Sequence, residues 1–175
     1  MAELDGKTAI VTGGATLIGR AVVRALCDAG ASVAVADVDE DGGSSLAAEL
    51  GERVLFVRTD LRDDDQIDEL RARTIDHFGG IDILVNLAAS YLDEGTASPR
   101  ADWLESLDVN VVSAVMMARA VRPHMKARGG GAIVNFTSIS SKIAQTGRWL
   151  YPVGKAALAS SRATWPWTLP PMGSG

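Results

Sequence analysis

Two residues near the end of the chain have side chains that can move a proton. The segment "YPVGK" (151–155) sets Tyr151 and Lys155 four residues apart, which places both on one face of a helix. Pro152 suits the first turn of that helix, because proline has no N–H to satisfy there. A phenol, with a pKa of about 10, is a poor acid or base at neutral pH, but a nearby ammonium stabilises the phenolate. The pair could therefore exchange a proton while a hydride moves, although exposed helical pairs share this spacing.

A glycine-rich turn follows the first apolar run of the chain. In "AIVTGGATLIGRA", Gly13, Gly14 and Gly19 stand between a predicted strand and a predicted helix. Glycines let such a turn close, and the helix N-terminus offers free amides and a positive dipole end to a pyrophosphate. A glycine-rich turn that only connects a strand to a helix would have the same sequence, so the turn alone is weak evidence for a dinucleotide site.

A carboxylate at the end of the second apolar run strengthens the dinucleotide interpretation. Asp37 lies 24 residues beyond Gly13, where a Rossmann unit places an acid on the adenosine ribose hydroxyls. A carboxylate there would repel the 2′-phosphate of NADP, and no Lys or Arg precedes Arg20 in the glycine-rich turn to offset it. The expected cofactor is NAD, with NADP disfavoured.

The elements that position these residues follow from alternating short apolar runs and longer amphipathic segments. Continuously apolar strands separated by helices indicate a parallel sheet covered on both faces, and right-handed crossovers make it a doubly wound α/β three-layer sandwich. The irregular stretches 90–99 and 139–150 follow predicted strands, at the edge where open α/β sheets bind ligands. Strands are expected at 8–11, 32–37, 53–60, 81–89 and 131–138, and helices at 18–29, 40–50, 63–78, 100–127 and 151–161.

The composition of the chain argues against two classes of binding partner, nucleic acids and membranes. The chain has 175 residues, 47% of them hydrophobic, which is enough for one domain with a core. A net charge of −5 argues against a nucleic-acid surface, and no window approaches a membrane span. The single Cys27 cannot form an internal disulfide, and the N-terminus has no apolar run behind a basic flank. We expect a cytoplasmic protein whose ligands are small molecules, with neither nucleic acid nor membrane as a partner.

Several motifs, in order and at matching spacing, resemble the short-chain dehydrogenase/reductase family over about residues 7–160. The segment "TGGATLIG" resembles the family's cofactor turn, and "NLAA" (86–89) is similar to its Asn-Asn-Ala-Gly stretch. "IVNFTS" (133–138) is similar to the strand that delivers the catalytic serine, 13 residues before the tyrosine. The residues that carry the resemblance to the cofactor site are Gly13, Thr16, Leu17, Ile18, Gly19, Asp37, Asp60, Leu61, Asn86, Ala88, Tyr151 and Lys155.

The resemblance also implies a catalytic set and a reaction. Tyr151 is expected to be the general acid/base, and Lys155 to make its phenol more acidic and to hold the nicotinamide ribose. Ser138 would hydrogen-bond the substrate oxygen, and Asn110 would hold a water that links Lys155 to solvent. The implied activity is hydride transfer between NAD and a secondary alcohol or ketone, without a metal. The stretches 90–99 and 139–150 would form part of the substrate pocket, with Trp149 either an apolar contact there or a core residue.

The sequence departs from the family pattern at three positions near the cofactor. Leu17 stands where the family has the middle glycine of the turn, and its Cβ is expected to obstruct the pyrophosphate or to force a different turn. Leu87 replaces an asparagine, and Ala89 a glycine. None of these changes removes a catalytic group.

The last residues do not continue the family pattern. Residues 1–161 are predicted to form the Rossmann-type dinucleotide-binding and catalytic domain, and 162–175 an aberrant tail in which Pro166 and Pro170 prevent a regular helix. A base slip in the gene just before Arg162 would explain the tail, because a shifted reading frame yields a family-like string; the nucleotide sequence tests this. The sheet is then expected to be incomplete at its C-terminal edge, and the chain marginally folded or aggregating.

Two other functions stay open at this point. The first is a nucleotide-binding fragment without catalysis. The second, which is weaker, is a sugar-nucleotide epimerase, since that class also uses Tyr-x-x-x-Lys; the short distance from turn to tyrosine counts against it. The family resemblance implies that the parent enzyme is a homo-oligomer, a dimer or a tetramer.

Overall fold

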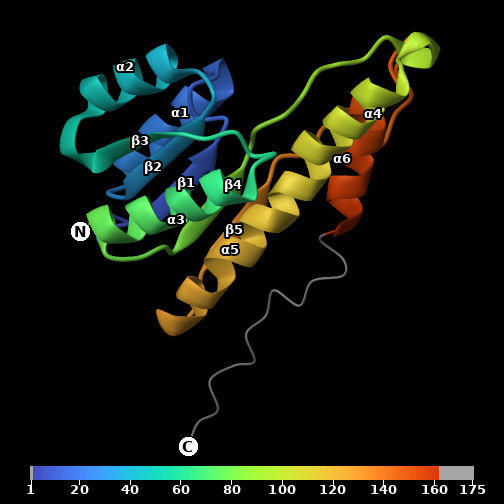
Figure 1. Ribbon diagram of the computed structural model, residues 1–175. Helices are drawn as coiled ribbons and strands as arrows, with labels where there is room; N and C mark the ends of the chain where they lie inside the picture. Colours follow the sequence, from blue (N-terminus) through green and yellow to red (C-terminus); the bar gives the residue numbers. More distant parts are fainter. Residues whose placement is uncertain (1, 162–175) are drawn as a thin grey trace, which may run out of the picture.

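Five parallel strands form the sheet at the centre of the molecule. The computed structural model describes residues 2–161 (Figure 1), and the predicted tail, 162–175, lies outside the described residues. The strand order is β3-β2-β1-β4-β5. The first three strands are added toward one edge of the sheet; the chain then crosses back from β3 and places β4 on the other side of β1. This confirms the doubly wound parallel sheet. The strands are β1 (Thr8–Thr12), β2 (Ser32–Asp37), β3 (Val54–Arg58), β4 (Ile83–Asn86) and β5 (Ala132–Asn135).

Helices connect the strands and begin where the sequence supplies caps. The carboxylates of Asp39 and Asp63 accept hydrogen bonds from the first-turn amides of α2 and α3, and Thr16 does the same for α1. Short 3₁₀ turns lie at Gly51–Arg53, Gly95–Ala97 and Ile139–Ser141. The helices are α1 (Leu17–Asp28), α2 (Glu40–Leu50), α3 (Asp64–Phe78), α4 (Arg100–Leu107), α5 (Ser113–Ala127) and α6 (Leu150–Ser161).

Two hydrophobic layers hold the helices on opposite faces of the sheet (Figure 1). Side chains that alternate along each strand enter one layer or the other. In-register neighbours such as Val11, Val35 and Val85 share the layer that α1 and α2 cover. The other layer packs against α3 and α5 and includes Ile10, Leu70, Leu84, Met117 and Val121.

The structure corrects the lengths of three predicted strands and the continuity of one helix. Beyond Asn86, the N–H groups of Leu87 and Ala88 donate to Thr12 Oγ1, at 3.1 and 3.3 Å, instead of to a neighbouring strand. The strand predicted at 81–89 therefore ends at Asn86. The strands predicted at 53–60 and 131–138 are also shorter, at Val54–Arg58 and Ala132–Asn135. The helix predicted at 100–127 is interrupted by a π-helical turn at Asp108–Val112, a feature that is often found at functional sites.

Strand β5 lies at one edge of the described sheet and is covered on one face only. Ile133 packs into the layer of α3 and α5. Val134, which is in register with the buried Val85, leaves 46% of its surface exposed. Among residues 2–161 no helix covers this second face of β5.

Candidate active site

The glycine-rich turn leaves no room for side chains between β1 and α1. Gly13 has φ +69°, and a Cβ there would lie 2.8 Å from Ala88 Cα. A Cβ on Gly19 would collide with the carbonyl oxygen of Gly13. Thr16 ties the turn together, because its Oγ1 donates to Gly13 O (2.7 Å) and accepts from Gly19 N (3.2 Å). The first amides of α1 follow this turn directly, and a helix N-terminus of this kind can bind a pyrophosphate.

Two apolar side chains of the turn lie on the surface. Leu17 is the first residue of α1 and leaves 88% of its surface exposed, and Ile18 is also exposed. No non-glycine residue between 2 and 161 has a positive φ, so the backbone at Leu17 is one that any residue adopts. Leu17 therefore begins an ordinary helix; its obstruction of the pyrophosphate stays a prediction.

Asp37 faces the glycine-rich turn from the end of β2. Its Oδ2 accepts from Ala15 N (2.9 Å), and its Oδ1 accepts from Asp39 N (3.1 Å). The carboxylate lines a cavity of about 280 Å³ outside the carboxyl ends of the strands. Other predicted cofactor residues that line this cavity are Gly13, Thr16, Asp60, Leu61 and Ala88. These residues fit a dinucleotide, since the cradle has no space for a Cβ and an acid stands beside it.

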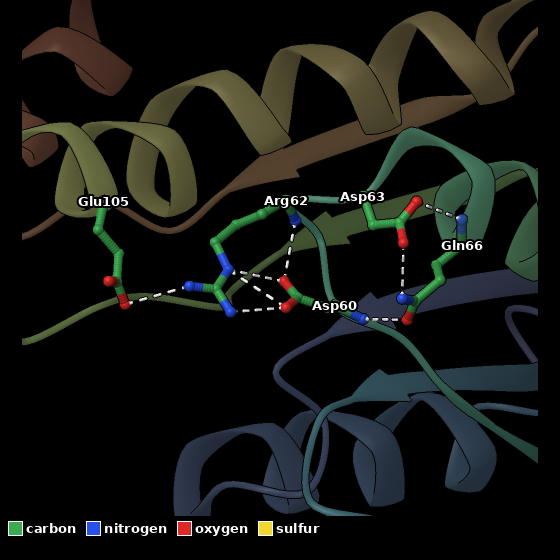
Figure 2. A network of polar contacts seen from close by, with 5 residues as sticks. All are labelled: Asp60, Arg62, Asp63, Gln66 and Glu105. Atoms are coloured by element: carbon green, nitrogen blue, oxygen red, sulfur yellow. Dashed lines mark hydrogen bonds and ion pairs between the residues drawn. The ribbon is translucent and has the colours of Figure 1, made fainter.

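Asp60 belongs to a polar network that continues to α4 (Figure 2). The Arg62 guanidinium donates to both Asp60 oxygens at 2.7–3.2 Å and forms an ion pair with Glu105 at 3.4 Å. The hydrogen bonds from Arg62 hold the pKa of the Asp60 carboxyl below its ordinary value. Asp60 N donates to Gln66 Oε1 (2.9 Å). Arg62 and Glu105 both line the cavity, and sequence reasoning had singled out neither.

Tyr151 and Lys155 lie on consecutive turns of α6, as the spacing predicted. Lys155 is only 2% exposed, and its Nζ donates to Phe136 O at 2.9 Å. Burial lowers the pKa of the Lys155 ammonium. The same Nζ lies 5.7 Å from the centre of the Tyr151 ring. Lys155 thus connects α6 to the chain segment that leaves β5 and leads to Ser138.

Asn110 joins three segments from inside the π-helical turn. Its Oδ1 accepts from Ser90 N, and its Nδ2 donates to Ser90 O and to Ser106 Oγ, each at 3.1 Å. Gly154 of α6 packs against it, because a Cβ on Gly154 would lie 3.1 Å from Asn110 Cβ. The buried amide therefore holds the segment after β4, the end of α4 and α6 together.

The hydroxyl of Ser138 is part of a short hydrogen-bonded chain. Ser138 Oγ accepts from Ser140 N (3.2 Å) and donates to Ser140 Oγ (3.0 Å). Ser140 Oγ in turn donates to Gln145 Oε1 (2.9 Å). The 3₁₀ turn that begins after Ser138 packs against α6, the helix that carries Tyr151. Ser140 and Gln145 were not predicted, and serines in a polar loop give no sequence signal for such a chain.

Asn86 is one of the predicted cofactor residues that do not line the cavity; the others are Leu17, Ile18, Gly19, Tyr151 and Lys155. Its buried side chain donates to Ala114 O (3.3 Å) and to Asn135 Oδ1 (2.9 Å), which are groups of α5 and β5. Asn86 therefore connects the sheet to α5, and a contact of its side chain with the cofactor stays a prediction.

The segment after β4 also reaches Tyr151 directly. The Tyr91 ring stacks on the Tyr151 ring, with centroids 5.2 Å apart and planes inclined by 20°. Burial, the neighbouring Tyr151 and a hydrogen bond to it raise the pKa of the Tyr91 phenol. Asp93 accepts from the N–H groups of Trp149 and Tyr151. Sequence reasoning assigned this segment to the substrate pocket but singled out neither Tyr91 nor Asp93.

The described residues contain no group of three or more His, Cys, Asp or Glu side chains that could hold a metal ion. None of the helices described is long and apolar enough to span a bilayer.

Comparisons with known proteins agree with this geometry. The family model described as short chain dehydrogenase matches residues 7–166. The chain is 37% identical over 160 residues to a sorbitol dehydrogenase of Cereibacter sphaeroides, covering 90% of this chain and 62% of that one. It is 34% identical over 165 residues to a cis-4-hydroxycyclohexanecarboxylate dehydrogenase of Sinomonas cyclohexanicum, covering 88% and 64%.

A solved structure shares the fold. A 7α-hydroxysteroid dehydrogenase, complexed with NADH and 7-oxo glycochenodeoxycholic acid, superimposes with a TM-score of 0.87 at 30% identity, covering 91% of this chain and 64% of that one. This chain therefore spans slightly less than two thirds of the length of these relatives. With the glycine-rich turn, the sheet and the Tyr-Lys helix all in place, the chain belongs to the short-chain dehydrogenase family of oxidoreductases.

Proposed function

We propose that this chain binds NAD and carries the catalytic residues of a dehydrogenase that interconverts a secondary alcohol and a ketone. The observation that carries the proposal is the Lys155 side chain, a buried amine four residues after Tyr151 and 5.7 Å from its ring. Burying an amine costs free energy unless it is hydrogen-bonded, as Lys155 is to Phe136 O, and a buried amine with a lowered pKa next to a phenol is a candidate functional group. Relatives named for their action on sorbitol and on a hydroxycyclohexane acid support the substrate class.

Tyr151, Lys155 and Ser138 are proposed to have separate roles in the reaction. Oxidation of a secondary alcohol removes a proton from oxygen and a hydride from carbon. When bound, the nicotinamide ring of NAD takes up the hydride or, in the reverse direction, donates it. Tyr151 accepts the proton at its phenolate oxygen, and Lys155 favours that anionic form. Ser138 donates to the substrate oxygen and stabilises negative charge that develops there.

The cofactor is proposed to be NAD because of Asp37. The carboxylate accepts from two backbone amides and stands beside the glycine-rich turn, where its negative charge would repel a 2′-phosphate. A relative with NADH bound supports this preference. Assembly as a dimer or tetramer is a proposal that rests on the family resemblance.

The test measures absorbance at 340 nm with NAD and a panel of cyclic, steroidal and polyol secondary alcohols. We expect NADH to form, and Tyr151→Phe to lower kcat by about 10²–10⁴-fold, the range that general acid/base catalysis supplies. NADH fluorescence titrations of both proteins check that binding survives the substitution. Binding without turnover in the parent chain would favour the alternative, a nucleotide-binding fragment without catalysis.

A further inference from the structure

The helix that carries Tyr151 begins without a cap of its own. Trp149 precedes the first helical residue, Leu150, and its indole has no acceptor for the first-turn amides. Its carbonyl already accepts the first helical bond, from Val153 N (3.2 Å). Pro152 contributes no N–H. The N–H groups of Trp149, Leu150 and Tyr151 therefore need an acceptor from another part of the chain.

Asp93 supplies that acceptor from the segment after β4. Its Oδ1 accepts from Trp149 N at 2.9 Å, and its Oδ2 accepts from Tyr151 N at 3.1 Å. The same Oδ1 accepts from Gly95 N (3.0 Å), which fixes the carboxylate on its own loop. Figure 1 shows this segment running to the top of α4, beside the start of α6. A single side chain 56 residues upstream thus serves as the N-cap of the helix.

The charge of Asp93 suits this position. Burial raises the pKa of the carboxyl, but the backbone N–H groups that donate to it outweigh burial, and the pKa lies below its ordinary value. The side chain is therefore a carboxylate at neutral pH. A negative charge at a helix N-terminus is stabilised by the exposed amide dipoles, so the contact favours both the charge and the helix.

We propose that Asp93 is a positioning residue, which holds Tyr151 in its catalytic place by capping α6 from the segment after β4. Tyr151 is the second residue of the helix, so fraying of the first turn would move its backbone directly. Asp93 acts on Tyr151 through the hydrogen bond that its Oδ2 accepts from the Tyr151 amide. The catalytic meaning of this role rests on the proposed function; the cap itself does not.

The experiment uses the chain with Tyr91→Phe, in which Tyr151 is the only tyrosine of the 175 residues. Tyrosine labelled with ¹³C in the ring then gives NMR signals from Tyr151 alone. Asp93→Asn keeps one acceptor oxygen, and Asp93→Ala keeps none. We expect one sharp set of ring signals in the parent, a small change in Asp93→Asn, and shifted or broadened signals in Asp93→Ala. Exchange of the Tyr151 amide should quicken in the same order, by roughly tenfold in Asp93→Ala, which corresponds to the loss of a cap worth about 1.4 kcal/mol.

Asp39→Ala is the matched control, because Asp39 caps α2 through Gly42 N (3.0 Å), on a different helix. It should lower stability without moving the Tyr151 ring signals. If Asp93→Ala does not fold, the comparison of Asp93→Asn with the parent gives the same test, since the Asn amide cannot accept from both helical amides. Unchanged ring signals and amide exchange, or an Asp39→Ala protein that behaves like Asp93→Ala, would overturn the proposal.

Kinetics on the same proteins separates the proposal from the function on which it rests. With turnover in the parent, Asp93→Ala should lower kcat more than it raises KM, and Asp93→Asn should restore part of kcat. If kcat does not fall across the parent, Asp93→Asn and Asp93→Ala in the order in which the ring signals change, the positioning role is contradicted. If the parent does not turn over any alcohol, the proposed function fails, and the ring signals and amide exchange still decide whether Asp93 holds Tyr151.

Discussion

At the scale of single residues, spacing correctly placed Tyr151 and Lys155 near each other, because helical geometry turns a four-residue separation into proximity. Tyr151 and Lys155 lie on one helix, and Lys155 is buried. Leu17 shows the limit of such reasoning. Leu17, in place of the motif's middle glycine, was expected to obstruct the pyrophosphate or to force a different turn; the structure has an ordinary helix start there, with the leucine side chain in solvent, and the obstruction stays a prediction. Motif spacing locates a residue, whereas its conformation depends on neighbours that the spacing does not reveal.

Asp37 carries a prediction at this scale. Asp37→Ala removes the acceptor proposed for the ribose and the charge proposed to repel a 2′-phosphate. We expect the Kd for NADH to rise by roughly tenfold or more, because a hydrogen bond to a charged group contributes about 1.5–3 kcal/mol. The Kd for NADPH should change less or fall. Fluorescence titrations with both nucleotides measure the ratio, and Asp39→Ala, which changes a nearby carboxylate outside the cavity lining, is the control. An unchanged ratio in Asp37→Ala would contradict the assignment.

At the scale of elements, the sequence predicted which strands and helices form but not the contacts between loops. The apolar runs predicted the five strands, because a short run of consecutive apolar residues indicates a buried strand and can be recognised without knowing the rest of the chain. The contacts of the segment after β4 with α6 depend on Asp93 and Gly95 meeting residues 52–58 positions later, and no local pattern records such a meeting. The π-helical turn at Asp108–Val112 also escaped prediction, because its residues suit an uninterrupted helix.

Gly95 provides a test of the contact between these two loops. Its φ is +60°, and a Cβ there would lie 2.8 Å from Gly147 O. Gly51 has a similar φ of +69°, but a Cβ there would meet nothing within 4 Å. Both Gly→Ala changes should cost the backbone strain of about 1–2 kcal/mol, and Gly95→Ala should cost more, because it also pushes the loops apart. Urea unfolding measures the difference; equal losses of stability would mean that the two loops do not pack as described.

At the scale of the whole molecule, a cluster of charges around the buried Asp82 joins the amino ends of β1 and β4, opposite the candidate site. Asp82 is 5% exposed; it accepts from Thr8 N (3.0 Å) and from Arg128 at 3.2 Å, and pairs with Lys7 at 3.4 Å. Burial raises the pKa of the Asp82 carboxyl, but the hydrogen bonds from Arg128 and Thr8 and the nearby positive charges outweigh it, and the pKa lies below its ordinary value.

This cluster predicts how stability depends on pH. A carboxyl whose pKa is lower in the folded than in the unfolded state stabilises the fold above the unfolded pKa of about 3.9, and that contribution is lost as the pH falls. Asp82→Asn should therefore lower the free energy of unfolding by about 1.5–3 kcal/mol at pH 7, and by progressively less below pH about 4. Asp68→Asn, at an exposed ion pair with Arg71, is the control and should cost little. A deficit that is constant from pH 7 to pH 3 would contradict this account.

The exposed face of β5 predicts how the 175-residue chain behaves in solution. Val134 is nearly half exposed, and among residues 2–161 no strand pairs with the other edge of β5. Such an edge can pair with a second chain, and burying the exposed half of Val134 contributes half of the roughly 1.5–3 kcal/mol of a full burial to the association. We expect the chain to self-associate as its concentration rises, in light scattering after size exclusion. Val134→Lys should raise the concentration of half-association by roughly tenfold or more, because a charge would be buried in the contact.

Leu104→Lys is the matched control, since Leu104 is exposed on α4. A monomer at all concentrations, or association that Leu104→Lys abolishes and Val134→Lys leaves intact, would show that β5 is not where copies of this chain meet.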